Sequence, residues 1–172
     1  MNKSSIVMMA GFRDAFLRDE PLNILDVGSQ VVNHPDQVAV GSYRRIFSNP
    51  KWKYTGADTA AGLNVDVVLR SQYHWQFADG EFDAVVSGQT MEHVEWPWVW
   101  LVEVARILKP GGYFCTIVPC MWREHRYPLD CYRYYPDGLR ALCRWAKLLP
   151  IETSFDERVN VYQSVKLVAQ KP

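Results

Sequence analysis

The feature that most constrains the fold of this chain is an apolar run that ends in an acid and a glycine. The run is Ile24–Ser29 (ILDVGS), and Asp58 closes the next apolar segment, Tyr54–Asp58 (YTGAD). Such runs are typical of buried parallel strands, and ligands of open α/β sheets bind at the carboxyl ends of these strands. The two segments therefore predict a nucleoside-bearing cofactor that lies across the ends of adjacent parallel strands.

Strand-like and helical patterns alternate along the chain. The strand-like runs cover residues 23–27, 53–57, 65–69, 82–87, 113–118, 151–155 and 162–169, and the helical patterns cover residues 6–17, 97 to the Gly111-Gly112 stop, and 136–145. This alternation predicts a single α/β domain over residues 1–172 with a largely parallel sheet. Residues 59–64 are too few for an ordinary crossover helix, so we expect a turn there or shifted strand bounds. Residues 71–81 have loop character.

Composition excludes several classes of function. The chain has 172 residues, with 19 basic and 19 acidic side chains, so its overall charge gives no reason to expect a nucleic-acid partner. Four cysteines without close pairing indicate reduced thiols and a cytoplasmic location. No apolar stretch approaches the length of a membrane span. The N-terminal apolar run is followed at once by charged residues, which favours an amphipathic helix over a signal peptide.

The glycine pattern separates two classes of cofactor. A nicotinamide dinucleotide calls for G-x-G-x-x-G, but residues 28–33 read GSQVVN. Binding of a pyrophosphate is therefore disfavoured, whereas Asp58 can still accept hydrogen bonds from ribose hydroxyls. S-adenosylmethionine is the common cofactor with adenosine and no phosphate.

Five segments in this order resemble the class I S-adenosylmethionine-dependent methyltransferases, and within them the methyltransferase-11-like group. They are residues 24–28 (ILDVG), 54–58 (YTGAD), 77–87 (FADGEFDAVVS), 91–94 (MEHV) and 106–112 (RILKPGG). The resemblance implies a Rossmann-like three-layer α/β/α sandwich with a seven-stranded, mostly parallel sheet whose last strand is antiparallel. It also implies S-adenosyl-L-methionine as the cofactor.

The same resemblance assigns cofactor-binding positions. It places the methionine part of the cofactor near Asp26 and Gly28 and the ribose on Asp58. The full expected set is Asp26, Gly28, Ser29, Gln30, Asp58, Thr59, Ser71, Gln72 and Ser87. Two positions depart from the family pattern, because Gln30 replaces a second glycine and Ser71 replaces the usual acid near the adenine. We expect these departures to affect affinity more than cofactor identity.

The acceptor side is expected after the fourth and fifth strands. His93 and His125 are the candidate catalytic bases, and a purely structural His93 remains the alternative. The segment 122–135 (WREHRYPLDCYRYY) supplies the candidate substrate-binding residues Arg126, Tyr127, Tyr132 and Arg133. Residues 123–147 hold six basic and three acidic side chains. This excess could hold a phosphate or carboxylate, or the arginines could simply pair with Glu124, Asp130 and Asp137.

Two further clusters of side chains have more than one interpretation. Cys120, His125 and Cys131 lack a C-x₂-C pair and a fourth ligand, so no metal site is predicted. Trp96, Trp98 and Trp100 predict core packing for at least one indole. An exposed pair would suit a homodimer contact or an acceptor wall.

These observations together predict an S-adenosylmethionine-dependent methyltransferase that transfers a methyl group to an oxygen of a small-molecule or glycan-like (sugar) acceptor. A non-catalytic methyltransferase-like module that binds a partner is the first alternative. An NAD-dependent oxidoreductase is the second, and it lacks the glycine fingerprint.

Overall fold

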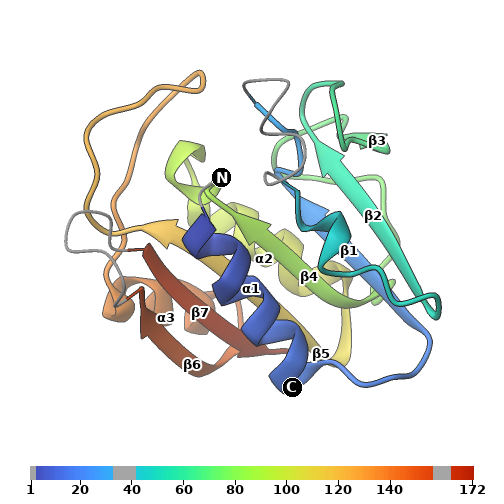
Figure 1. Cartoon of the computed structure of the whole chain (residues 1–172). Helices are drawn as coiled ribbons and strands as arrows, with labels where there is room; N and C mark the ends of the chain where they lie inside the picture. Colours follow the sequence, from blue (N-terminus) through green and yellow to red (C-terminus); the bar gives the residue numbers. More distant parts are fainter. Residues whose placement is uncertain (1–2, 33–41, 157–163) are drawn as a thin grey trace.

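The computed structural model describes residues 3–32, 42–156 and 164–172, which build a sheet with helices on both faces (Figure 1). The elements in chain order are α1 (Lys3–Phe16), β1 (Leu22–Val27), the 3₁₀ helix η2 (Tyr43–Arg45), β2 (Trp52–Asp58), β3 (Val67–Val68), β4 (Phe82–Gly88), the 3₁₀ helix η3 (Met91–His93), α2 (Pro97–Ile107), β5 (Leu108–Pro119), α3 (Pro136–Trp145), β6 (Leu149–Phe155) and β7 (Ser164–Gln170).

The sheet has the strand order β3-β2-β1-β4-β5-β7-β6. Strands β1 to β5 pair in parallel, and β7 runs antiparallel to both β5 and β6. This confirms the predicted seven-stranded, mostly parallel sheet with an antiparallel last strand. Strand order reverses between β1 and β4, so the chain leaves their carboxyl ends in opposite directions and opens a crevice there.

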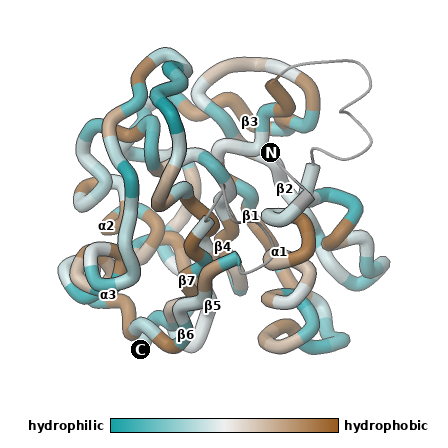
Figure 2. Tube along the Cα trace, turned by 60° about the vertical axis from the view of Figure 1, so that its left-hand side comes forward, coloured by the Kyte–Doolittle hydropathy of each residue, from teal (hydrophilic) through white to brown (hydrophobic). Residues whose placement is uncertain are grey.

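Each face of the sheet is covered by its own apolar layer. On one face α1 and η2 bury Met9, Phe12 and Tyr43 against strand residues of β1, β4, β5 and β7. On the other face α2 and α3 bury Trp100 and Leu139, with the apolar neighbours of each, against the opposite sides of the same strands. Figure 2 shows the brown, hydrophobic strands lying between these layers. The three-layer α/β/α sandwich is therefore confirmed.

The structure differs from the sequence prediction at one helix end. The pair Gly111-Gly112 does not stop α2, which ends at Ile107, and instead lies inside β5. The register between β4 and β5 shifts here, and Gly111 has a φ of +79°. The two glycines thus form part of a bulge in β5 and do not cap a helix.

The connection between β2 and β3 is a turn, as its short length predicts. No helix forms between β2 and β3, and β3 itself is reduced to two residues instead of the predicted 65–69. Residues 71–81 contain no helix or strand, as predicted. The last strand begins at residue 164, and the first two residues predicted for it, 162 and 163, lie outside the described residues.

Candidate active site

A cavity of about 960 Å³ opens at the carboxyl ends of β1, β2 and β4. Its lining includes Gly28, Asp58 and Gln72 on the side of the first strands. Residues after β4 and β5 line the other side, among them His93 and His125. The fold therefore brings both halves of the predicted site to one cavity.

The turn after β1 depends on glycine. Gly28 has a φ of +79°, and a Cβ at this position would lie 2.1 Å from the side-chain oxygen of Thr90. The Gly28 backbone N–H donates to the carbonyl of Ala57 at 2.9 Å, which fixes the turn against β2. The sequence indicated Gly28 but not Thr90, whose role depends on β4 lying next to β1.

Asp58 lies at the end of β2 with its carboxylate at the cavity. Its Oδ2 accepts from the backbone N–H of Gln30 at 3.0 Å, and its Oδ1 accepts from the backbone N–H of Thr59 at 2.7 Å. A carboxylate oxygen has room for a second hydrogen bond. The Thr59 hydroxyl also donates to Oδ1, in a long contact of 3.4 Å. Asp58 is thus oriented mainly by the backbone, and it can accept from a further hydroxyl at Oδ2 and from another at Oδ1 in place of Thr59.

Asp26 is buried beside this cavity and does not line it. The Tyr54 hydroxyl donates to its Oδ2 at 2.5 Å, while its Oδ1 has no hydrogen-bond partner. The pKa of Asp26 is raised to about 7, mainly by burial; the Tyr54 hydrogen bond opposes the rise, the charge of Asp58 adds to it and Arg44 opposes it.

The other predicted cofactor residues fall into two groups. Gln30, Thr59 and Gln72 line the cavity, whereas Ser29, Ser71 and Ser87 do not. The Ser29 and Ser87 hydroxyls donate to the carbonyls of Asn64 at 3.1 Å and Val27 at 2.8 Å, so they join neighbouring strands and turns; the Ser71 hydroxyl accepts from the backbone N–H of Tyr73 at 3.1 Å.

Residues 120–135 form the β5–α3 loop, which is anchored on η3. The Glu92 carbonyl accepts from the backbone N–H groups of Cys131 at 2.7 Å and Tyr132 at 3.2 Å. The Tyr134 hydroxyl donates to the carbonyl of Met91 at 2.9 Å, and the Tyr132 hydroxyl donates to the carbonyl of Glu95 at 2.8 Å. The loop is therefore held to the element that follows β4.

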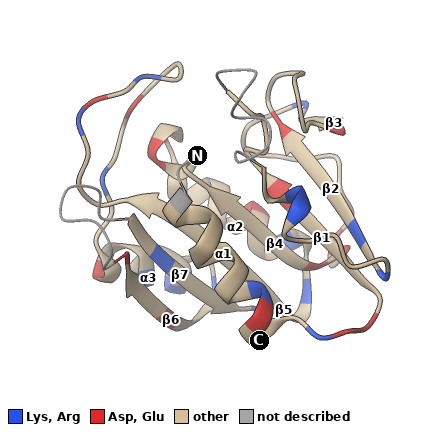
Figure 3. Ribbon diagram, viewed as in Figure 1, with Lys and Arg blue, Asp and Glu red and all other residues tan. Residues whose placement is uncertain are grey.

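Charges on this loop pair within the loop. Arg133 donates two hydrogen bonds to Asp130, at 2.6 and 2.7 Å, which hold the pKa of Asp130 well below its usual range. Arg126 pairs with Glu124 at 2.7 Å, and a further pair at the start of α3 joins Arg140 and Asp137. Figure 3 shows these basic and acidic segments interspersed along the loop. The pairing alternative that the sequence left open is therefore confirmed.

Only two of the four predicted substrate-binding residues line the cavity. Arg126 and Tyr127 line the cavity, but Tyr132 and Arg133 lie outside its lining. The Tyr132 hydroxyl donates to the carbonyl of Glu95, and Arg133 donates to carbonyls of the loop. The Tyr127 hydroxyl donates to Gln30 Oε1 at 3.3 Å. This contact joins the loop to the turn after β1.

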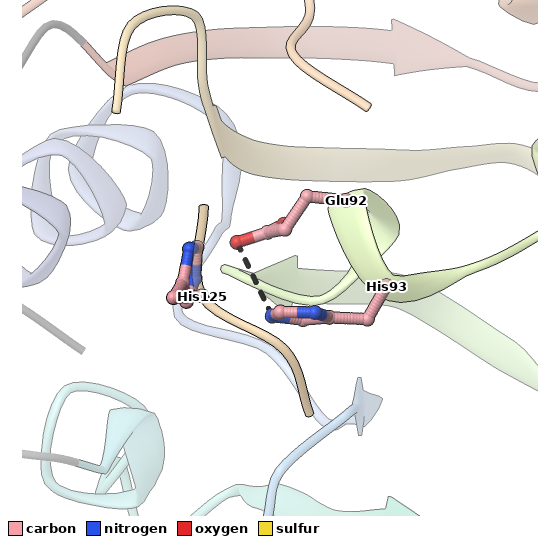
Figure 4. Close-up of side chains that lie close together, drawn as sticks. All are labelled: Glu92, His93 and His125. Carbon is pink, nitrogen blue, oxygen red and sulfur yellow. Dashed lines mark ion pairs between the residues drawn. The ribbon is translucent and has the colours of Figure 1, made fainter. Parts of the chain in front are cut away.

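The two predicted catalytic histidines lie together. The rings of His93 and His125 are 4.9 Å apart between centroids, and both line the cavity. Glu92 lies next to them with a fully buried carboxylate (Figure 4), and burial raises the pKa of Glu92 to about 8. Burial lowers the pKa of His93. Sequence reasoning missed Glu92, although an acid beside a histidine after a buried strand was a signal for it.

Trp100 is buried and packs against Phe114, as core packing of one indole requires. Trp96 and Trp98 are exposed.

In the described part of the chain, no helix is both long and apolar enough to cross a membrane.

Comparison with known proteins supports the geometric interpretation. A protein-family model described as a methyltransferase domain matches residues 39–116. An uncharacterized methyltransferase of Schizosaccharomyces pombe is 42% identical over 52 residues, which is 30% of this chain and 19% of that protein. Over the matched residues, which are less than half of the chain, the protein is similar to the methyltransferase-domain family. The predicted family, class I S-adenosylmethionine-dependent methyltransferases, is thereby confirmed.

Solved structures agree with the methyltransferase fold. One is a proposed methyltransferase in complex with the Haloferax volcanii Trm112 methyltransferase activator, with a TM-score of 0.74, 18% identity, and coverage of 99% of this chain and 90% of that one. Another is the 1,6-didemethyltoxoflavin-N1-methyltransferase of Burkholderia thailandensis with bound S-adenosylhomocysteine, with a TM-score of 0.71, 14% identity, and coverage of 99% and 79%. At these identities the likeness shows the fold of the methyltransferase domain.

Proposed function

We propose that this methyltransferase domain binds S-adenosylmethionine across the turn after β1 and the end of β2, and methylates an oxygen of a small acceptor. The observation that carries the proposal is the cavity itself. Its lining brings Gly28 and Asp58 together with His93, His125 and Tyr127. One side fits a nucleoside and the other a polar substrate.

The residues present fit the cofactor. Gly28 leaves the turn without a Cβ, so a ligand can approach the backbone closely. Asp58 is already oriented by two backbone N–H groups and retains acceptor capacity for the two ribose hydroxyls. Gln72 lines the cavity next to the position where the family pattern has an acid, and its amide offers both a donor and an acceptor to an adenine.

When bound, S-adenosylmethionine would supply an electrophilic sulfonium methyl group for transfer to an acceptor oxygen, with S-adenosylhomocysteine as the leaving group and the hydroxyl proton passing to a base. The protein's part is alignment, exclusion of water and assistance to the departing proton. His93 and His125 lie on the acceptor side for the last task. The β5–α3 loop covers the acceptor side and excludes water.

The charge pairs of the loop favour a neutral, hydroxyl-bearing acceptor such as a sugar. Arg133 is engaged by Asp130, and Arg126 is paired with Glu124, so carboxylates of the loop engage two of its three arginines. Trp122 and Tyr127 line the cavity and offer aromatic faces beside hydrogen-bonding groups. Such surfaces suit the apolar face and the hydroxyl edge of a sugar ring.

Calorimetric titration with S-adenosylmethionine, S-adenosylhomocysteine and NAD⁺ tests the cofactor assignment. We expect micromolar binding of the first two and none of NAD⁺. A screen with a labelled methyl donor against sugars and small hydroxylated or anionic compounds then tests the acceptor. If the isolated domain binds no cofactor, the alternative of a non-catalytic or partner-completed module is favoured.

A further inference from the structure

Three potential metal ligands meet on the acceptor side of the cavity. Glu92 and His93 come from η3, and His125 comes from the β5–α3 loop (Figure 4). One potential ligand atom from each residue lies within 4.8 Å of the other two. His93 Nε2 lies 3.9 Å from Glu92 Oε1.

The Glu92 carboxylate lacks the partners that a buried charge needs. Its side chain is fully buried, and neither Oε1 nor Oε2 accepts a hydrogen bond. A buried carboxylate without a hydrogen bond or counter-charge is strongly unfavourable. The nearby Arg133 is already bonded to Asp130 and to loop carbonyls. Glu92 therefore presents an unpartnered buried carboxyl group toward the two histidines.

The tautomer of His93 is fixed in the form that binds metals. Its Nδ1 lies 2.5 Å from the carbonyl of Leu129, which can only accept, so Nδ1 carries the proton. In the neutral ring, Nε2 then presents a lone pair on the side of Glu92. Metal-binding histidines typically have their second nitrogen bonded in this way to a carbonyl or carboxylate. A lone pair facing a carboxyl oxygen is unfavourable unless a proton or a metal cation lies between them, and either one can occupy this position.

His125 faces the same cluster from the β5–α3 loop. Its Nδ1 lies 3.5 Å from Asp130 Oδ2, 3.4 Å from the carbonyl of Arg123 and 3.5 Å from Arg133 Nη2. The side chain of Asp130 also accepts from the His125 backbone N–H at 2.6 Å, which holds the residue in place.

We propose that Glu92, His93 and His125 form a binding site for one divalent transition-metal ion such as Zn²⁺. Two imidazole nitrogens and one carboxylate oxygen are typical of zinc sites that keep an open coordination position. Ligand atoms around a tetrahedral ion, at about 2.0–2.2 Å from it, lie roughly 3.4 Å apart. Side-chain movements of about an ångström therefore close the triad around an ion.

The open position of such a site faces the cavity, because His93 and His125 line it while Glu92 lies behind them. An oxygen of the acceptor can occupy that position, where the ion lowers the pKa of a bound hydroxyl. This role of the ion rests on the proposed methyl transfer. The presence of the metal site does not depend on methyl transfer, and it can be tested without any cofactor.

The test is a calorimetric titration of untagged, chelator-treated protein with ZnCl₂, supported by visible absorption of the Co²⁺ form. We expect 1:1 binding by the wild type. Since loss of even an outer partner of a metal site weakens affinity about 10–100-fold, Glu92→Gln and His125→Ala should each weaken it by about a hundredfold or more. His74→Ala is the matched control, because His74 also lies 3.9 Å from a carboxylate, that of Glu103, but is exposed and outside the triad. It should leave binding unchanged.

Thermal denaturation separates loss of the site from loss of the fold. Zn²⁺ should raise the unfolding temperature of the wild type but not that of Glu92→Gln, which should be at least as stable as the metal-free wild type because an unpaired buried carboxylate is removed. Absence of 1:1 binding by the wild type, or equal binding by Glu92→Gln and His125→Ala, overturns the proposal. Cofactor binding measured on the same samples is independent: S-adenosylhomocysteine affinity without Zn²⁺ binding leaves the proposed function standing and removes the metal site.

Discussion

Removal of the Asp58 carboxylate tests the cofactor side of the site most directly. Its two oxygens are each oriented by one backbone N–H, and the Thr59 hydroxyl also donates to Oδ1 in a long contact of 3.4 Å that a ribose hydroxyl can replace. Hydrogen bonds to a charged acceptor contribute about 1.5–3 kcal/mol each, and partial exposure reduces this to roughly 1–2 kcal/mol. Asp58→Ala should therefore weaken S-adenosylhomocysteine by roughly 2–4 kcal/mol, which is about 30- to 1000-fold in Kd.

The same substitution also removes support from Gln30 and Thr59, so the assay must separate the two effects. Calorimetry with S-adenosylhomocysteine and its 2′,3′-dideoxy analogue gives a double cycle. Wild-type protein should lose affinity for the analogue, whereas Asp58→Ala should bind both ligands about equally. Asp66→Ala is the control, because Asp66 also accepts a backbone N–H, that of Gly56 at 2.8 Å, but does not line the cavity. Equal losses for both ligands in Asp58→Ala, or an unchanged Kd in the folded variant, would refute the ribose assignment.

Three further outcomes follow from the geometry. Gly28→Ala should lower the unfolding temperature and weaken S-adenosylhomocysteine, because φ is +79° and the new Cβ overlaps the Thr90 side chain, whereas the open helical site Gly11→Ala should not; thermal scans with and without ligand compare them. Asp26 has a pKa raised to about 7, so the native state keeps a proton that the unfolded chain releases near pH 4. Between these pH values the wild type should lose up to about 1.4 kcal/mol of stability per pH unit relative to Asp26→Asn. Urea denaturation of both proteins at pH 4–8 measures this loss, and parallel stability profiles would contradict it. Asp130→Asn should speed hydrogen exchange in the β5–α3 loop and raise the acceptor KM while leaving cofactor affinity unchanged; unchanged exchange would count against the anchoring role.

The fold was largely predictable because its signals are local. Buried parallel strands are continuous apolar runs, and each predicted run overlaps an observed strand. The exceptions arise where pairing with a neighbour overrides the local pattern. Gly111-Gly112 is a helix-stop signal taken alone, but the register shift between β4 and β5 places it in a bulge. Sequence cannot reveal such a shift, because it depends on which strand lies beside β5.

The lining of the cavity was predictable at Gly28 and Asp58, and less completely around His93 and His125. Gly28 and Asp58 stand at strand ends, where topology fixes their position. Glu92 and His125 are 33 residues apart in the sequence, and they meet because backbone N–H groups of the β5–α3 loop bond to the carbonyl of Glu92. These contacts involve main-chain atoms and leave no residue-type signal. Ser29, Ser71 and Ser87 were predicted from family positions, and they do not line the cavity. A family position does not specify the direction in which a hydroxyl group points.

The two halves of the cavity also differ in what supports them, and this difference bears on substrate choice. Gly28 and Asp58 are held by the sheet itself, so changes there disturb the fold as well as the cofactor. The β5–α3 loop is held mainly by η3 and by its own Arg133–Asp130 pair, while residues 122–128 carry the side chains that face the cavity. Substitutions at Trp122 or Tyr127 can therefore alter the acceptor surface without loss of sheet contacts. We infer that the identity of the acceptor resides in this segment, between the fixed cofactor turn on one side and the Glu92–His93–His125 cluster on the other.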